Sequence, residues 1–329
     1  MSNLTPVKVG ILGAGTHARE VLIPALEKIP DLLRPVALAT AHPETARAAQ
    51  DRYRLRCHVG FRALIDDPEV EAVIVASTDH ETHAIAALEA GKHVFNETGA
   101  ISTREGARRI RELARAGNLV YEVGYCLRYT PLYRKMKTLL DSWRTESPGP
   151  RTFSVSYYPY VGHFHNLLMY FAGEIRSVLA LQHADKSGAV QLFRFANGDL
   201  AALTWARFHN DSPRMEQVTI THPTGKMVAD NGRTLRFHRT PESRKHPVTE
   251  LSFADADALL FDLTYSISGG RNTPLHMRGY VPELEEFVRC VRTGETPASG
   301  VDDAEASLLV RQAVNRSQQA GGTWVDVEK

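Results

Sequence analysis

The first 125 residues alternate short β-branched runs with helix-like stretches, a pattern that predicts a parallel sheet covered by helices on both faces. We expect strands at 7–13, 34–40, 55–59, 72–77, 93–97 and 119–124. Helices are expected at Ala18–Lys28, Pro43–Tyr53, Glu81–Ala90 and Ser102–Ala116. The last of these opens with Ser102 and Glu105 in capping-box spacing and ends at Gly117. Together they predict an α/β domain with a doubly wound Rossmann sheet.

From about residue 150 the strand-like runs follow one another without intervening helices, which implies an open, mostly antiparallel sheet. The runs are Thr152–Tyr158, Val178–His183, Ala189–Phe195, Ala201–Phe208, Gln217–His222, Lys226–Ala229, Thr234–Phe237 and Val248–Phe253. Helices are expected at Asn166–Ala172, Val281–Arg292 and Asp302–Gln319. Thr264–Arg278 is interpreted as a long loop that either covers a cleft or connects surface elements. We therefore expect a Rossmann domain over 1–125 and an α+β domain over 126–329.

Composition restricts the partners. A chain of 329 residues with 43% hydrophobic residues is long enough for two cores. Its 39 basic and 38 acidic residues leave a net charge of +1, so no bulk attraction to nucleic acid or to an anionic membrane is implied. The three cysteines, Cys57, Cys126 and Cys290, fit reduced thiols, and no apolar signal or membrane-spanning run is present. We expect a cytoplasmic protein with a small-molecule partner.

A glycine-containing turn follows the first expected strand. In Gly13–Ala18, Gly13 permits a tight turn, and Gly15 lets the backbone approach a pyrophosphate. Ala18 takes the place of a third glycine in close helix-strand packing, with Thr16 and His17 between them. The pyrophosphate would rest on free N–H groups at the helix start. The segment predicts a dinucleotide cradle; an ordinary strand-turn-helix connection is the alternative.

The end of the second expected strand bears on the cofactor. Binders of the unphosphorylated dinucleotide usually place an acid here for the ribose diol, and Thr40-Ala41-His42 contains none. An arginine for a 2′-phosphate is also missing, although the hydroxyl of Thr40 and the ring of His42 could serve one. The sequence predicts NAD(P) as the cofactor, with a slight preference for NADP.

Several segments carry a family resemblance: the glycine turn, Thr78–His83, the run Ala87-Leu88-Glu89-Ala90-Gly91-Lys92-His93-Val94, and Gly124-Tyr125 followed by Arg128-Tyr129-Thr130-Pro131. Together they resemble the glucose-fructose oxidoreductase / inositol dehydrogenase / MocA family over nearly the whole chain. The resemblance implies hydride transfer between NAD(P) and a carbon bearing a hydroxyl or carbonyl, commonly on a sugar or cyclitol. Beyond the turn and the second strand, the cofactor-binding residues expected are Ser77, Thr78, His80, His83, Glu97 and Arg128.

The sequence departs from the family at two places. Members typically carry Glu-Lys-Pro after the fifth strand, where this chain has Glu97-Thr98-Gly99. The family lysine would stabilise a developing alkoxide, whereas Thr98 donates a hydrogen bond without charge. A second family element, an aspartate four residues before a histidine and another three after it, corresponds here to Pro159, His163 and Asn166. Only the histidine is retained.

The catalytic residues expected are His163, Tyr160 and Thr98. His163 suits general acid-base work because its unperturbed pKa lies near neutrality, and His165 or Tyr125 could assist. A hydrogen-bonded core histidine is the alternative for His163.

Other candidates have structural alternatives too. Glu97 is expected near the nicotinamide, although a glutamate at a strand end is otherwise usually solvated. His83 is more often structural, and Arg128 either faces the cleft between domains or joins them by a salt bridge. No metal is assigned, because the histidines lack ligand spacing.

Three functions remain open at this stage. The first is an active oxidoreductase whose acid-base group has moved; the second is a cofactor-binding sensor or partner subunit without turnover. The third is a redox-neutral enzyme with permanently bound NAD(P). The resemblance also implies a homodimer or homotetramer. The alternating run Val190–Trp205 is consistent with a pairing face, although burial under the chain's own helices explains it equally well.

Overall fold

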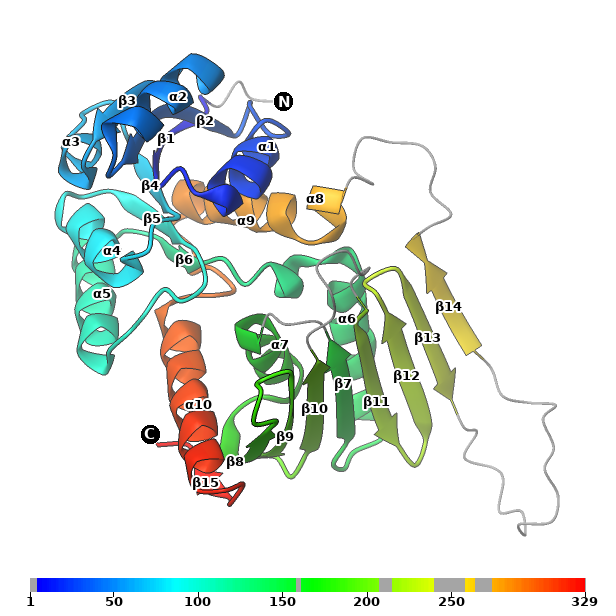
Figure 1. Ribbon diagram of the computed structural model, residues 1–329. Helices are drawn as coiled ribbons and strands as arrows, with labels where there is room; N and C mark the ends of the chain where they lie inside the picture. Colours follow the sequence, from blue (N-terminus) through cyan, green and yellow to red (C-terminus); the bar gives the residue numbers. More distant parts are fainter. Residues whose placement is uncertain (1–4, 158–160, 207–214, 240–257, 264–273, 329) are drawn as a thin grey trace, which may run out of the picture. The chain divides into compact units, whose positions relative to one another are not determined.

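The structure is a computed structural model that describes residues 5–157, 161–206, 215–239, 258–263 and 274–328 (Figure 1). The chain divides into two compact units. The first comprises Met1–Tyr129 and Pro274–Leu308, and the second comprises Thr130–Thr273 and Leu309–Lys329. From the sequence we expected a single domain boundary, after residue 125. In the structure, residues 274–308 also belong to the first unit, which differs from that expectation.

The first unit is built on six parallel strands in the order β3-β2-β1-β4-β5-β6. Their bounds are β1 Val7–Leu12, β2 Leu33–Thr40, β3 Arg56–Val59, β4 Ala72–Val75, β5 His93–Asn96 and β6 Tyr121–Val123. This order is that of a doubly wound Rossmann sheet, which confirms the predicted fold class. The strand order reverses between β1 and β4, where such sheets open a crevice for ligands.

Six helices connect these strands: η1 Ala18–Leu22, α1 Ile23–Leu26, α2 Pro43–Tyr53, α3 Phe61–Ile65, α4 His80–Glu89 and α5 Arg104–Gly117. The expected single helix Ala18–Lys28 begins instead as a π-helical turn, in which the Ile23 N–H bonds to the Ala18 carbonyl. Pro24 follows directly and has no N–H to continue the regular pattern. The five-residue α3 is too short to show a helical period in the sequence.

The start of α5 corrects a second expectation. Its N-cap is Thr103 rather than Ser102, since the Thr103 hydroxyl accepts the Gly106 N–H at 2.9 Å. The Ser102 N–H instead donates to Glu81 Oε2 at 2.7 Å, and the Thr103 N–H donates to the same oxygen. The helix ends at Gly117 as expected, with Asn118 in the left-handed region at φ 50°. Glu81 therefore ties the start of α4 to the start of α5.

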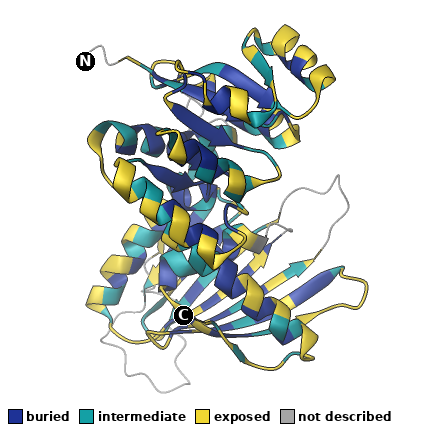
Figure 2. Ribbon diagram, turned by 90° about the vertical axis from the view of Figure 1, so that its left-hand side faces the viewer, coloured by how far each residue is buried: buried dark blue, intermediate teal, exposed yellow. Residues whose placement is uncertain are grey.

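Two hydrophobic layers enclose this sheet (Figure 2). On one face, α1 and α9 (Tyr280–Thr293) pack against the strands, and the Phe287 ring lies 5.8 Å from that of Phe95. On the other face lie α3, α4, α5 and the beginning of α10 (Val301–Gln319). Leu284 and Phe287 of α9 are fully buried, which explains why this late segment belongs to the first unit.

The second unit is built on nine strands in the order β14-β13-β12-β11-β7-β10-β9-β8-β15. Their bounds are β7 Thr152–Tyr157, β8 Ile175–Gln182, β9 Gly188–Phe195, β10 Leu200–Ala206, β11 Gln217–His222, β12 Gly225–Asp230, β13 Thr234–Arg239, β14 Ala258–Asp262 and β15 Val325–Asp326. Only β7 and β10 pair in parallel among these described strands, which confirms the mostly antiparallel sheet. The expected strand Val248–Phe253 and the last residues of Ala201–Phe208 lie outside the described residues.

Helix α6 (Pro131–Glu146) lies against β12 and β13, and the sequence did not predict it. Thr130 caps it by accepting the Tyr133 N–H, and Pro131 occupies its first turn. A second helix, α7 (Val161–Ala172), is longer than the expected Asn166–Ala172. On β7 the alternation of buried and exposed residues gives one covered face and one open face.

Short elements complete the description. Residues Cys126–Tyr129 form the 3₁₀ turn η2. The loop expected over Thr264–Arg278 is wrong at its end, because Pro274–Met277 forms the short helix α8, and 264–273 lie outside the described residues. Among the described helices, none combines the length and apolar character needed to cross a bilayer.

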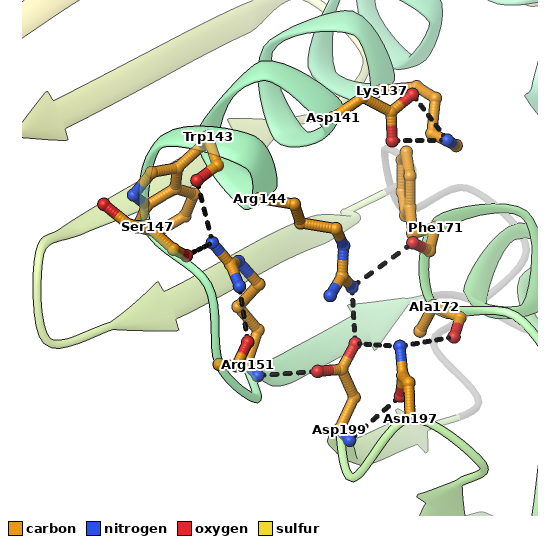
Figure 3. A network of polar contacts seen from close by, with 11 residues as sticks. Lys137, Asp141, Trp143, Arg144, Ser147, Arg151, Phe171, Ala172, Asn197 and Asp199 are labelled. Atoms are coloured by element: carbon orange, nitrogen blue, oxygen red, sulfur yellow. Dashed lines mark hydrogen bonds and ion pairs between the residues drawn. The ribbon is translucent and has the colours of Figure 1, made fainter.

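A polar network at the start of β7 is centred on two buried residues of the second unit, Arg151 and Asp199 (Figure 3). Asp199, which has no exposed surface, accepts the Arg151 N–H at 2.6 Å and pairs with the Arg144 guanidinium. Asn197 Nδ2 donates to the second Asp199 oxygen at 3.1 Å. The Arg151 guanidinium donates to the carbonyls of Trp143 and Ser147 at 3.0 and 2.6 Å. This network joins the end of α6 to the β9–β10 turn.

Candidate cofactor site

The turn after β1 requires its first glycine. Gly13 has φ +107°, and a Cβ there would stand 2.5 Å from the Ala76 carbonyl oxygen at the end of β4. No residue other than glycine fits that approach. A Cβ on Gly15, in contrast, would meet nothing within 4 Å. The turn is therefore closed on its strand side and open at Gly15, as a cradle for a phosphate needs.

The helix start beside this turn presents unused amides. The first helical hydrogen bond runs from the Arg19 N–H to the Gly15 carbonyl at 3.1 Å, so the amides before Arg19 have no partner within the helix. Thr16 is exposed here, while Ala18 is 1% exposed and packs closely, as expected for the third glycine's position. A helix start of this kind stabilises an anion. The residues present fit the pyrophosphate of a dinucleotide.

The end of β4 carries Ser77, Thr78 and His83. Ser77 Oγ and His83 Nδ1 lie 2.6 Å apart, and the His83 ring packs 4.4 Å from that of Phe61. Burial lowers the pKa of His83, so the neutral imidazole is favoured. These contacts support a structural role for His83 in holding the strand end. Thr78 is exposed at the edge of the crevice.

At the end of β5, Asn96 is fully buried and organises its neighbours. Its Oδ1 lies 2.9 Å from His80 Nδ1, and its Nδ2 donates to the Tyr121 hydroxyl at 3.1 Å. His80 is thereby fixed against the strand end. Asn96 and Tyr121 were not identified from the sequence, where an asparagine before Glu97 carries no distinct signal.

Glu97 follows Asn96 and contacts the glycine turn. Its Oε1 lies 3.1 Å from His17 Nε2, and the two side chains are 10% and 41% exposed. Burial opposes ionisation of His17, but the hydrogen bond and the charge of Glu97 outweigh it and raise its pKa. The sequence expected both residues at the cofactor, and the structure brings them together. The Thr98 N–H lies 3.4 Å from Glu97 Oε2.

Two further carboxyl groups lie in this unit's interior. Glu122 of β6 and Glu283 of α9 have no exposed surface. Burial, followed by the charges of Glu97 and Glu122, raises the pKa of Glu283 well above its usual value. Neither residue was identified from the sequence, although each is an acid within an otherwise apolar stretch.

The end of β2 carries Thr40 and His42, the two residues that the sequence expects at the ribose of the cofactor. Gly60 donates its N–H to the Thr40 carbonyl at 2.9 Å, so the ends of β2 and β3 lie together. His42 is exposed at the N-cap of α2 and its side chain makes no capping bond there. Both candidate side chains stand at the strand end where a ribose would be read.

Arg128 has a structural partner. Its guanidinium donates to the Ala298 carbonyl at 2.8 Å and to Asp303 Oδ1 at 2.5 Å, and it is 7% exposed. Of the two expected roles, the contacts match the salt bridge, although it joins η2 to α10 within one unit. Tyr125, named as a possible assistant, is also buried, at 4% exposed.

The remaining candidates lie in the second unit. His163 is partly exposed on α7, whereas His165 is 2% exposed and its Nε2 lies 2.6 Å from Gln191 Oε1. Burial lowers the pKa of His165 to about 4, so it stays neutral. Asn166 is fully buried. Tyr160 and Pro159 lie outside the described residues. Across the described part of the chain, no three His, Cys, Asp or Glu side chains gather as metal ligands would.

This chain is similar in sequence to several known proteins. Residues 7–125 match the model of an oxidoreductase family with an NAD-binding Rossmann fold. Inositol 2-dehydrogenase 2 of Saccharopolyspora erythraea is 42% identical over 102 residues, which is 30% of this chain and 30% of that protein. A dTDP-3,4-didehydro-2,6-dideoxy-alpha-D-glucose 3-reductase of Saccharopolyspora spinosa is 25% identical over 97% of this chain and 99% of its own length.

A solved structure extends the likeness to the whole fold. Levoglucosan dehydrogenase in complex with NADH and L-sorbose superposes with a TM-score of 0.81 at 19% identity, covering 99% of this chain and 100% of that one. The fold and the match over residues 7–125 thus define a chain with an NAD-binding Rossmann domain. More particularly, residues 7–125 are similar to the glucose-fructose oxidoreductase / inositol dehydrogenase / MocA family.

Proposed function

We propose that this protein is an NAD(P)-dependent oxidoreductase that transfers a hydride to or from a hydroxyl or carbonyl carbon. The observation that carries the proposal is the turn at Gly13–Ala18, which is closed by Ala76 on one side and open at Gly15 on the other. Its unused amides suit a pyrophosphate, and the strand order β3-β2-β1-β4-β5-β6 places the turn at the point where such sheets bind dinucleotides. The bound cofactor supplies the hydride chemistry.

The substrate class proposed is a sugar or cyclitol. Relatives named for inositol and for a dideoxy-glucose derivative support this choice. Specificity within the class depends on loops, which differ most among proteins that share a fold.

His163, Tyr160 and Thr98 are proposed as the groups that exchange a proton with the substrate oxygen. His163 is partly exposed, in contrast to the buried His165 two residues later, which supports its choice over that neighbour. Thr98 stands where the family carries lysine and supplies a hydroxyl without charge. Replacing His163 by glutamine is expected to lower kcat by about 10²-fold or more with little change in cofactor affinity, measured by steady-state kinetics.

NADP is proposed over NAD. No acidic residue occurs in Thr40-Ala41-His42, and both Thr40 and His42 can contact a 2′-phosphate. Replacing Ala41 by aspartate should move the preference toward NAD. Dissociation constants for NADH and NADPH, measured by fluorescence titration before and after this change, test the assignment.

The function itself is tested by incubating the purified protein with NAD⁺ or NADP⁺ and a panel of cyclitols and aldoses while absorbance at the nicotinamide band is followed. Reduction of the cofactor with at least one substrate is expected. Tight cofactor binding without any turnover, in either direction, would contradict it.

A second candidate is a protein that binds the cofactor without net oxidation, either as a sensor or partner subunit or in a redox-neutral reaction. This candidate is supported by Thr98, which is uncharged and stands where the family carries a lysine. In the sensor case, restoring lysine at position 98 creates no activity. In the redox-neutral case, the nucleotide remains with the protein until denaturation and appears in the supernatant by mass spectrometry.

We also propose a cytoplasmic location and a homodimer or homotetramer. The free thiols of Cys57, Cys126 and Cys290 support a reducing compartment. Val190 and Leu200 are 44% and 49% exposed on the second sheet, which supports pairing through its open face. Light scattering coupled to gel filtration measures the oligomeric state.

A further inference from the structure

A histidine and a glutamate join the glycine turn to the end of β5. His17 Nε2 lies 3.1 Å from Glu97 Oε1, although the two residues are far apart in sequence. The Nε2 atom itself is buried, while the His17 side chain as a whole is 41% exposed. Glu97 therefore holds the Nε2 side of the ring. We therefore assign proton exchange with solvent to the other ring nitrogen, Nδ1.

Three other ionisable groups face this pair. The Tyr280 ring at the start of α9 lies 5.9 Å from the His17 ring in an edge arrangement. The carboxyl group of Glu283 is also close enough for the charges of Glu97 and Glu122 to act on it. Burial chiefly raises the pKa of Glu283, which favours the neutral form of that carboxyl. His17, whose own pKa is raised by Glu97 against the effect of burial, is thus the counter-ion of Glu97.

Glu97 lies on the nicotinamide half of the sheet. In a doubly wound sheet, one set of three strands holds the adenosine half of a dinucleotide and the other set holds the second nucleotide. Here β1, β2 and β3 carry the turn and the ribose-reading end of β2, so β4, β5 and β6 belong to the nicotinamide. Glu97 follows β5 directly and draws the His17 ring toward that half. This step rests on the proposed function.

We propose that His17 and Glu97 discriminate the oxidised from the reduced cofactor by the charge of its nicotinamide ring. The oxidised ring carries a positive charge and the reduced ring carries none. While His17 is protonated, it neutralises Glu97 and leaves no net attraction for a cationic ring. When His17 is neutral, the Glu97 carboxylate is available to the ring, which then replaces the imidazolium as its counter-ion. Binding of oxidised cofactor accordingly releases one proton from His17 to solvent, and no covalent bond changes at either residue.

Binding measurements across pH test this proposal without turnover. Dissociation constants of NAD⁺, NADH, NADP⁺ and NADPH are measured by calorimetry from pH 5.5 to 9 at fixed ionic strength. Affinity for the oxidised forms is expected to rise with pH up to the pKa of His17 in the free protein. The total rise is about tenfold for each unit by which the ring displaces that pKa. Affinity for the reduced forms should stay level over the same range.

Matched variants assign the effect to His17. His17→Gln keeps a donor for Glu97 but does not titrate, so the pH dependence of the oxidised-to-reduced affinity ratio should disappear. His58→Gln is the control, because His58 also faces a carboxylate, Asp67 at 3.6 Å, but lies on β3 in the adenosine half. This control should retain the full pH dependence. Glu97→Gln removes the carboxylate that attracts the cationic ring, so affinity for the oxidised forms should fall and the pH dependence of the affinity ratio should be lost.

Each contrary outcome is distinct. If both redox forms weaken together at high pH, His17 binds the phosphates and the proposal is overturned. A ratio that is independent of pH in the unaltered protein also overturns it. Should His17→Gln not fold, NMR titration of the His17 imidazole decides instead: its pKa must fall with NAD⁺ or NADP⁺ and not with the reduced forms. If no dinucleotide binds at any pH, the proposed function fails as well.

Discussion

The two units bury ionisable groups in opposite ways. In the second unit, each Asp199 oxygen accepts a hydrogen bond, and the Arg151 guanidinium donates to three backbone carbonyls (Figure 3). In the first unit, both oxygens of Glu283 are buried without a hydrogen-bond partner, and Glu97 shares its charge with a half-exposed histidine. A buried carboxylate whose oxygens are both hydrogen-bonded stabilises a fold, whereas one whose oxygens are left unsatisfied costs stability. The difference separates a structural network from the region proposed to bind the cofactor.

Removing the carboxylate of the satisfied network should have the largest effect. Asp199→Ala leaves the Arg144 guanidinium and a buried backbone N–H without their acceptor, so the free energy of unfolding should fall by about 3–5 kcal/mol. Urea denaturation followed by circular dichroism measures the loss. Asp185→Ala, which removes an exposed carboxylate that accepts the Ser187 N–H at 3.0 Å, is the control and should lower the unfolding free energy by only a small fraction of that loss. An equal effect of both would mean that the network is not stabilising.

The two glycines of the turn should separate folding from binding. Gly13→Ala forces a Cβ against the Ala76 carbonyl at a positive φ, so the unfolding free energy should drop by about 2–4 kcal/mol. Gly15→Ala meets no protein atom, so it should leave stability unchanged and weaken dinucleotide binding by about tenfold or more. Thermal unfolding and fluorescence titration are applied to both variants. Unchanged affinity in Gly15→Ala would contradict a close approach of the pyrophosphate.

His165 should make the second unit sensitive to acid. Its pKa is lowered by burial to about 4, below the value of 6.5 in the unfolded chain, so the unfolded state binds the proton first as pH falls. This contribution to stability is complete above pH 6.5 and is lost progressively between pH 6.5 and 4, to a total of up to about 3 kcal/mol. Unfolding of the unaltered protein and of His165→Asn at pH 7 and pH 5 measures it. The difference between the two proteins should narrow at pH 5.

Glu283→Gln should have the smallest effect and the opposite sign. The pKa of Glu283 is raised in the folded state, so unfolding releases its proton and stability declines as pH rises above the unfolded value. The amide cannot ionise, so the variant should be more stable than the parent by about 1 kcal/mol at pH 8 and equal to it near pH 4. Denaturation at the two pH values checks this. A destabilised variant at pH 8 would show that the ionised carboxylate is required.

Local patterns were sufficient for the Rossmann sheet and for its turn. Helix α2 has the predicted bounds, and Gly13 has the positive φ that its place in the turn implies. Helix α6 was not predicted, even though it has apolar residues at helical spacing. The N-cap of α5 is Thr103 and not the expected Ser102, because Glu81, which is distant in sequence, accepts the Ser102 N–H.

The sequence predicted the candidate site residues that follow the ends of strands. It did not predict contacts that depend on how helices pack on the sheet. Gly13, Gly15, His17 and Glu97 follow strands directly, and parallel strands bring their carboxyl ends to one edge. The proximity of Glu283 to Glu97 and Glu122 arises only when α9 packs on the sheet. The salt bridge from Arg128 to Asp303 likewise joins residues whose separation in sequence conceals their contact.

The return of α9 to the first unit limits how this protein can be divided. A fragment ending at residue 125 would lack Leu284 and Phe287 and would expose the apolar face that includes Ile11, Ile74 and Phe95. Such a fragment is expected to aggregate when it is produced alone. Exchange of the nucleotide-binding unit between relatives therefore requires three junctions, after Tyr129, before Pro274 and after Leu308. Recombination at a single point would yield a hybrid with mismatched halves of one core.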